Sequence, residues 1–154
     1  MVRVSTIVEP RWLSTPQQAI WRDYLNATAR INEKLDAELR SFGLDLGEYE
    51  ILVHLSESPE LQMRMSDLAS AVRQSRSRLT HTVTRMERKG LILRKSCPSD
   101  RRGVIAVLTG SGLTLLKTAA PTHVESVREV FIDRVDPDDL AALGRAMNAV
   151  VLAD

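Results

Sequence analysis

The sequence is poor in the residues that several classes of function require. It holds one cysteine, Cys97, which excludes an intramolecular disulfide framework and suits a reducing compartment. Its three histidines, His54, His81 and His123, fall on separate predicted elements and have no metal-ligand spacing. No phosphate-binding loop or nucleophile motif occurs. We therefore expect no enzyme activity, no metal and no cofactor.

Long apolar runs are also missing. No segment approaches the roughly 20 apolar residues of a membrane span, and residues 1–10 lack the continuous apolar core of a signal peptide. We therefore expect a cytoplasmic protein with no membrane partner. The 154 residues, 44% hydrophobic and 27% charged, suit one globular domain with helical extensions.

Positive charge is concentrated in the middle of the chain. Between Arg64 and Arg102 there are 11 basic and 3 acidic residues, a net charge of +8. The whole chain carries +1, so the rest carries −7. A basic segment between acidic flanks is typical of a module that binds a polyanion, although a charge cluster alone is more often a solvated surface.

The first 43 residues predict a tail and a long amphipathic helix. Apolar residues recur every three or four positions, and Gly43 ends the pattern. Thr15 is expected to cap this helix, with Pro16 at its first position and Gln18 completing a capping box. The helix would be about 39 Å long. A helix of this length in a small protein tends to need a partner along its flank.

Residues 111–154 predict further apolar helices. Thr109 should cap the first, Pro121 should kink or break it, and Asp136 should cap the last. Such helices have little core to join in a minimal domain, so we expect them to pack against a second copy of the chain. The residues predicted for this dimer interface are Trp12, Ile20, Leu140, Leu143, Met147, Val150 and Val151.

The middle of the chain predicts three short helices. Asp45 and Glu48 form a capping box that begins the first, and residues 59–64 are expected to be a loop. Ser66 and Ser75 should cap the next two helices, whose connection of about three residues forces a steep crossing. This arrangement is a helix-turn-helix.

A β-hairpin is expected directly after these helices. Residues 91–96 and 103–108 are rich in branched side chains and flank the turn-like stretch 97–102. A hairpin in this place is a wing. The predicted fold is mainly α with a small β-hairpin wing, a winged helix-turn-helix in residues 44–110 flanked by dimerisation helices in residues 1–43 and 111–154.

The helix over residues 75–89 has two different faces. Leu79, Val83 and Met86 have the spacing of a buried face. The opposite face is basic and short-polar, with no acid before Glu87, whereas an ordinary exposed helix mixes Glu with Lys. Arginines and hydroxyls suit phosphate and base-edge contacts in the major groove. The DNA-binding residues predicted on this helix are Ser75, Arg76, Ser77, Arg78, Thr80, His81, Thr82 and Arg85.

The wing tip adds two candidate DNA contacts. Arg101 and Arg102 lie at the turn of the hairpin, and arginines at such a tip enter the minor groove, where negative potential concentrates. Asp100 is expected to orient an arginine or cap the turn rather than to touch DNA. A merely solvated turn is the alternative.

Taken together, residues 65–112 resemble the MarR family of winged-helix regulators. The resemblance is carried by Leu68-Ala69, the helix ending in Glu87-Arg88-Lys89-Gly90-Leu91, the wing Asp100-Arg101-Arg102-Gly103, and Leu108-Thr109 with Gly112. It implies a homodimer that binds double-stranded DNA at a roughly palindromic operator, often as a repressor. The chain departs from the family in two respects. Arg73 and Gln74 stand where glycine and an apolar residue are common, and the only cysteine, Cys97, lies beside the wing, whereas the peroxide-sensing branch carries its reactive cysteine near the N-terminus.

The resemblance also implies release from DNA by a small effector, often an aromatic or lipophilic acid. Trp21, Tyr24, Tyr49 and His54 are the residues predicted to line such a pocket, although aromatic residues at helical spacing are more often core. Two other hypotheses remain open. One is control of the protein by oxidation of Cys97, which lies near several basic residues. The other is a winged helix that serves protein contact instead of DNA binding.

Overall fold

A computed structural model describes residues 9–153, apart from the side chain of Arg101. The chain divides into two compact units, one ending at Arg30 and the other beginning at Ile31. Over residues 9–153, no helix is long and apolar enough to cross a membrane.

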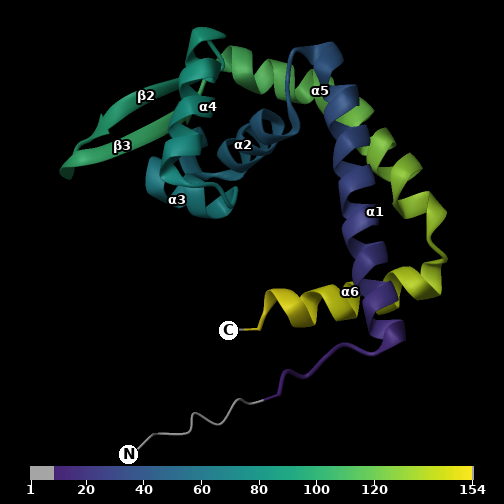
Figure 1. Ribbon diagram of the computed structural model, residues 1–154. Helices are drawn as coiled ribbons and strands as arrows, with labels where there is room; N and C mark the ends of the chain where they lie inside the picture. Colours follow the sequence, from purple (N-terminus) through teal and green to yellow (C-terminus); the bar gives the residue numbers. More distant parts are fainter. Residues whose placement is uncertain (1–8, 154) are drawn as a thin grey trace, which may run out of the picture. The chain divides into compact units, whose positions relative to one another are not determined.

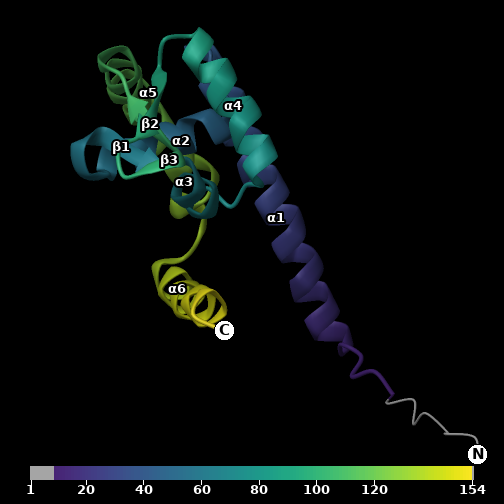
Figure 2. The same ribbon diagram turned by 90° about the vertical axis from the view of Figure 1, so that its left-hand side faces the viewer.

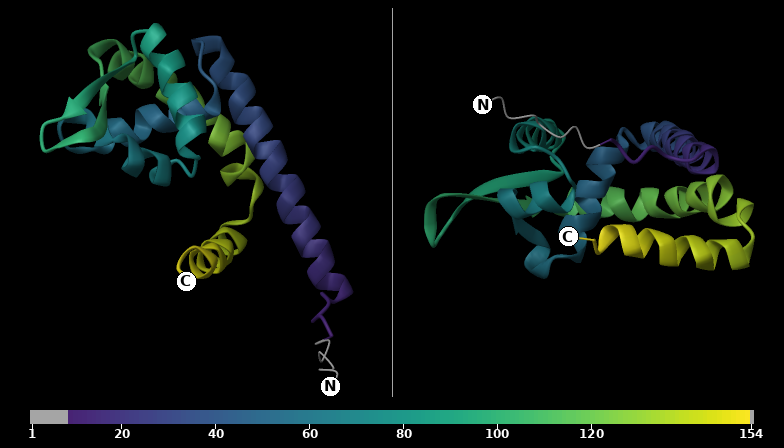
Figure 3. Two further views of the ribbon diagram at one scale, coloured as in Figure 1. Left: turned by 60° about the vertical axis from the view of Figure 1, so that its left-hand side comes forward. Right: turned by 60° about the horizontal axis from the view of Figure 1, so that its bottom comes forward.

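The protein is mainly helical, with one small antiparallel sheet, as predicted (Figure 1). The α-helices are α1 (Thr15–Leu39), α2 (Leu46–Glu57), α3 (Met65–Ala71), α4 (Arg76–Arg88), α5 (Gly110–Val130) and α6 (Pro137–Val151). The strands are β1 (Gln62–Arg64), β2 (Ile92–Cys97) and β3 (Asp100–Leu108). Short 3-10 helices are η1 (Arg40–Phe42), η2 (Pro59–Leu61) and η3 (Ile132–Arg134). Figure 3 shows α1 as one unbroken helix.

The elements from α2 to β3 form a winged helix-turn-helix. The strands lie in the order β1-β3-β2 (Figure 2), and the β2–β3 hairpin extends beyond α3 and α4 (Figure 1). The strand β1 corrects the predicted loop over residues 59–64. It pairs with β3 in the register Met63–Ala106. A strand of three residues that depends on a partner more than 40 positions away has too little local pattern to be seen in the sequence.

One hydrophobic core joins the helices to the sheet. Ile51 and Leu52 of α2, Leu68 of α3, Val83 of α4 and Ile92 of β2 are each 0% exposed. The core thus takes one face from each helix of the module, and the opposite face of α4 is left for other contacts.

Several predicted caps are confirmed. Asp45 accepts from the Glu48 backbone N–H at 2.7 Å, and the Glu48 side chain accepts from the Asp45 backbone N–H at 3.1 Å, which is a complete capping box. Thr109 caps α5, and Asp136 caps α6. The helix α5 continues through Pro121, so of the two predicted outcomes, a kink or a break, the break does not occur.

Two predicted caps are wrong by one or two positions. The cap of α1 is Ser14, whose hydroxyl accepts from the Gln17 backbone while the Gln17 side chain accepts from the Ser14 backbone N–H at 2.9 Å. Helix α3 follows Arg64 without a side-chain cap, so Ser66 lies inside its first turn. Neighbouring serines and threonines offer similar caps, and the sequence does not choose among them.

The turn between α3 and α4 is built without glycine. Arg73 adopts a left-handed conformation with φ of 53°, and the Gln74 N–H donates to the Ala69 carbonyl at 2.9 Å. The end of α4 has the same pattern, with Gly90 at φ of 72° and the Leu91 N–H donating to the Met86 carbonyl at 3.0 Å. Arg73 therefore adopts the left-handed conformation that a glycine would commonly provide, and the geometry of the turn is retained.

Gly112 marks a close approach between α5 and the chain that follows α4. A Cβ atom there would overlap the carbonyl oxygen of Leu91 and lie 2.8 Å from Cδ1 of Leu108. Gly112→Ala should therefore lower the free energy of unfolding by about 3 kcal/mol, the upper range for overpacking, because a backbone carbonyl cannot move aside. Urea unfolding checks this. Gly110→Ala is the matched control, since nothing lies within 4 Å of its Cβ position; equal effects of the two changes would contradict the packing argument.

Candidate nucleic-acid interface

The helix α4 exposes the predicted basic face. Leu79, Val83 and Met86 are at most 1% exposed, which fixes the rotation of the helix about its axis. Most of the predicted contact residues then lie on the exposed side: Ser75, Arg76, Ser77, Arg78, Thr80, His81 and Arg85. The Ser75 hydroxyl also accepts from the Arg78 N–H at 3.2 Å and begins the helix, as predicted.

Thr82 departs from the prediction. Its side chain is 7% exposed, and its hydroxyl donates to the Arg78 carbonyl at 3.1 Å. Thr82 directly precedes buried Val83, so it lies at the edge of the packed face rather than on the exposed one. We therefore exclude it from the interface.

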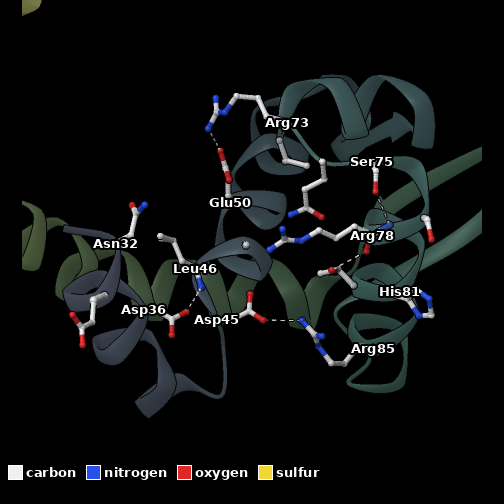
Figure 4. Close-up of a pocket in the computed structure, with 16 residues that line it drawn as sticks. Asn32, Asp36, Asp45, Leu46, Glu50, Arg73, Ser75, Arg78, His81 and Arg85 are labelled. Carbon is white, nitrogen blue, oxygen red and sulfur yellow. Dashed lines mark hydrogen bonds and ion pairs between the residues drawn. The ribbon is translucent and has the colours of Figure 1, made fainter. Parts of the chain in front are cut away.

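A groove of about 990 Å³ separates the start of α2 from the first turns of α4. Figure 4 shows Arg78 extending from α4 into this groove, with Asp45 and Leu46 on the opposite wall. Arg78 makes no side-chain hydrogen bond or ion pair with another residue in the described part of the chain. Its guanidinium thus retains its donors for an external acceptor.

A buried carboxylate lies beside this groove. Glu48 is 1% exposed, and its oxygens accept from Arg85 Nε and Lys89 Nζ, each at 2.9 Å. Arg85 Nη2 also donates to Asp45 at 2.7 Å (Figure 4). Burial by itself would raise the pKa of Glu48, but the hydrogen bonds from Lys89 and Arg85 outweigh it and hold the pKa below its usual value.

Arg85 is thus engaged within the protein. Its guanidinium bridges two carboxylates of α2, so its predicted role as a DNA contact is not favoured by this geometry. The sequence places Arg85 on the correct side of α4 but contains no sign that α2 supplies acids to the same place.

The acid that ends the basic stretch of α4 faces the hairpin. Glu87 accepts from Arg94 Nη2 at 2.6 Å and from the Arg94 backbone N–H at 2.9 Å. The hydrogen bond from the Arg94 side chain lowers the pKa of Glu87. The exposed face of α4 therefore keeps its positive charge, and α4 is tied to β2.

The wing turn is organised by Asp100. Its carboxylate accepts from the Arg102 backbone N–H at 3.0 Å, which confirms the predicted cap. Arg64 lies 3.7 Å from the same carboxylate and donates to the Ser99 hydroxyl at 3.3 Å. Arg64, Arg76 and Arg102 line one cleft between α4 and the wing. The sequence did not single out Arg64, because β1 was not predicted, and the side chain of Arg101 lies outside the described residues.

The residues predicted for an effector pocket occupy different places. Tyr49 is buried, and its ring centroid lies 4.3 Å from that of His123 on α5. Both line a cavity of about 460 Å³, where His123 Nδ1 is buried without a hydrogen-bond partner in the described chain. Burial lowers the pKa of His123. The sequence did not single out His123 for this pocket, because an isolated histidine carries no pattern.

The other three residues predicted for this pocket lie elsewhere. His54 does not line this cavity. Trp21 and Tyr24 belong to the N-terminal unit, where they stack on each other at 5.6 Å and are 52% and 45% exposed.

Cys97 is 7% exposed at the end of β2. Its sulfur lies 3.3 Å from the Ser99 hydroxyl, and this hydrogen bond lowers the pKa of the thiol. An oxidant would reach the buried sulfur less readily than the sequence-based hypothesis of redox control assumed.

The predicted dimer residues are largely uncovered in the single chain. In the N-terminal unit, Trp12 and Ile20 are 81% and 69% exposed. On α6, Val150 and Val151 are 69% and 78% exposed and Met147 is 36% exposed, while Leu140 and Leu143 are half-buried.

Comparison with known proteins gives consistent similarities. Residues 44–104 match the MarR family model. The structure of AbsC, a MarR family transcriptional regulator from Streptomyces coelicolor, is 48% identical, covers 92% of this chain and 96% of its own, and has a TM-score of 0.87. Sco3205 from the same organism, solved in complex with DNA, is 41% identical over 93% of this chain and 90% of its own, with a TM-score of 0.89. The regulator MhqR of Bacillus subtilis is 27% identical over 66% of this chain and 68% of its own length.

The lowered pKa of Glu48 generates a prediction on stability. A carboxylate with a depressed pKa stabilises the fold above the ordinary value of 4.5 and loses this effect as the pH falls through the folded pKa. At neutral pH, Glu48→Gln should lower the free energy of unfolding by about 2 kcal/mol, because charge-assisted hydrogen bonds become neutral ones. The difference from the parent should shrink at acid pH.

Urea unfolding over a pH series measures this difference. Glu57→Gln, an exposed acid on the same helix, is the control and should show no such effect. A difference that is constant with pH would mean that the charge of Glu48 does not stabilise the fold.

Proposed function

Because the chain belongs to the MarR family of transcriptional regulators, we propose that it binds double-stranded DNA as a homodimer at a pseudo-palindromic operator and acts as a repressor. The same membership makes it a regulator and not an enzyme. The observation that carries the proposal is the exposed face of α4, whose arginines include Arg76 and Arg78 and whose acid Glu87 is paired elsewhere.

The first part of the proposed interface is α4 in the major groove. The N-terminal half of the helix carries short hydroxyls and two arginines, which suit base edges and phosphates. Arg78 is free to extend, because no internal acid within residues 9–153 pairs with it. Sco3205, which is 41% identical, was solved in complex with DNA, and this supports DNA binding by the present chain.

The second part is the wing in the minor groove. Arg102 lies two residues into β3, close to the hairpin turn, and the Asp100 cap holds the turn. Arg76 and Arg64 line the same cleft, so phosphate oxygens between the two grooves would meet three arginines. We propose Arg101, next to Arg102, as a further minor-groove contact.

The third part is dimerisation through the N-terminal helix and α6. Exposed large apolar side chains are costly in water, and here they gather in the N-terminal unit and at the C-terminal end of the chain. A second copy that covers them accounts for this exposure. It also supplies the two-fold symmetry that a palindromic operator requires.

The proposal is tested by selection from a random duplex library at two salt concentrations, with the mass of the protein measured in solution. A dimer that enriches a two-fold symmetric motif, with half-sites about one helical turn apart, is the expected result. Recovery that is insensitive to salt and enriches no motif would contradict it. The protein-contact hypothesis would then explain the basic face better.

The two parts of the DNA interface should respond differently to mutation. Arg78→Ala should reduce the preference for the selected operator over random DNA by about 1–3 kcal/mol, because it loses a base contact. Arg102→Ala should lower the affinity for the selected operator and for random DNA alike, and it should lower the salt slope by about 1, because it loses contacts near phosphates. Fluorescence anisotropy at several salt concentrations measures both quantities.

Arg128→Ala is the control, since Arg128 lies on α5 and pairs with Asp133. If Arg78→Ala lowers the affinity for all DNA sequences equally, Arg78 contacts only phosphate and not a base.

We further propose that the cavity between Tyr49 and His123 takes a small aromatic or lipophilic acid that releases the DNA. The cavity is lined by residues of α1, α2 and α5, and α2 also carries Glu48. A ring against Tyr49 and an acceptor or donor for the unpartnered His123 Nδ1 would complete it.

This effector proposal predicts a loss of response in His123→Gln. Substituted benzoates, added to the protein–operator complex, should lower DNA binding by the parent at concentrations that leave His123→Gln bound to DNA. Anisotropy of labelled operator measures the release. The matched control is His54→Gln, which does not line the cavity; a response lost in both variants, or in neither, would contradict this pocket.

A further inference from the structure

Glu48 has more partners than a helix cap requires. Its side chain closes the capping box of α2 with Asp45, and it also accepts from Arg85 of α4 and from Lys89, the residue that caps the C-terminal end of α4. Lys89 Nζ additionally donates to the Gly43 carbonyl at 2.9 Å. The first turn of α2 and the last turns of α4 are thus joined by a single buried group.

This joint fixes the orientation of α4. Arg85 and Lys89 are one turn apart and hold the C-terminal half of the helix from the α2 side. Glu87 and Arg94 hold it from the β2 side. With the apolar face packed beneath, the helix is prevented from rolling, and Arg78 is presented at one angle.

The same joint removes two cations from the DNA interface. Non-specific binding rises with the number of cations that reach phosphates, whereas sequence preference comes from base edges. Arg85 and Lys89 both form ion pairs with Glu48, and Arg85 also forms one with Asp45. Their pairing lowers the attraction to any DNA and leaves recognition to the N-terminal half of α4.

We propose that Glu48 is a positioning residue that sets the DNA specificity of the protein: it orients α4 through Arg85 and Lys89 and withholds these two cations from DNA phosphates. The inference rests on the proposed DNA-binding function and deepens it. Glu48 itself touches no DNA, since it is 1% exposed.

Glu48→Gln tests the proposal, because a simple effect of charge and the proposed positioning role predict opposite changes in operator affinity. Removal of a negative charge should by itself tighten binding to all DNA. If Glu48 sets specificity, operator affinity should fall roughly tenfold, as for the loss of one base contact, while affinity for a scrambled duplex stays the same or rises. The salt slope should also steepen by about 0.9 for each released cation that reaches a phosphate.

Two further variants separate positioning from folding and from simple charge. Arg85→Gln should still fold, because Arg85 is half-exposed and Lys89 continues to pair with Glu48. It should lower operator preference without changing the salt slope. A slope shallower by about 0.9 would make Arg85 a phosphate contact and overturn the proposal. Glu57→Gln, which removes an exposed charge from the same helix, should leave the ratio of operator to scrambled affinity unchanged.

The outcomes for Glu48→Gln are distinct from those for the proposed function. If the parent protein enriches no motif, the proposed function fails. If the parent binds its operator specifically and Glu48→Gln changes both affinities by one factor with the same slope, only the positioning role fails. A lower ratio of operator to scrambled affinity, together with a steeper salt slope, supports the positioning role. A smaller folded fraction cannot produce this result, because it would lower both affinities by the same factor.

Discussion

A carboxylate removed from water needs partners for its charge, and the winged module is arranged around one such group. Glu48 is 1% exposed, and its partners come from the start of α2 and the end of α4. Removal of either cation would leave a buried charge less well compensated, which is costly. The relative position of the two helices therefore depends on this ionic contact as well as on their shared apolar core.

The distribution of charge along the chain acquires a structural meaning from this contact. The basic excess of residues 64–102 is not spread evenly over one surface. Arg85 and Lys89 face Glu48, and Arg94 faces Glu87, so these cations hold the module together. Arg76 and Arg102 instead line the cleft beside the wing. A count of charges overestimates the part of the basic segment that is open to a polyanion.

Local signals in the sequence were sufficient for most of the fold. The capping box at Asp45 and the cap at Ser75 are each made by neighbouring residues, and both were predicted. Interactions between distant segments were not. The pairing of β1 with β3 and the contact between Tyr49 and His123 join positions more than 40 residues apart, which no local pattern encodes.

The same distinction explains which side chains of α4 were correctly predicted to be exposed. Helical spacing gives the angle of each side chain around α4, and that angle correctly exposes Arg76 and Arg78. It does not reveal which exposed side chain meets an acid from another helix, so Arg85 was grouped with them. The exposed face of α4 therefore has two halves with different contacts, which the sequence presents as one face. Its C-terminal half is committed to α2, and its N-terminal half carries the arginine that no internal acid engages in the described chain.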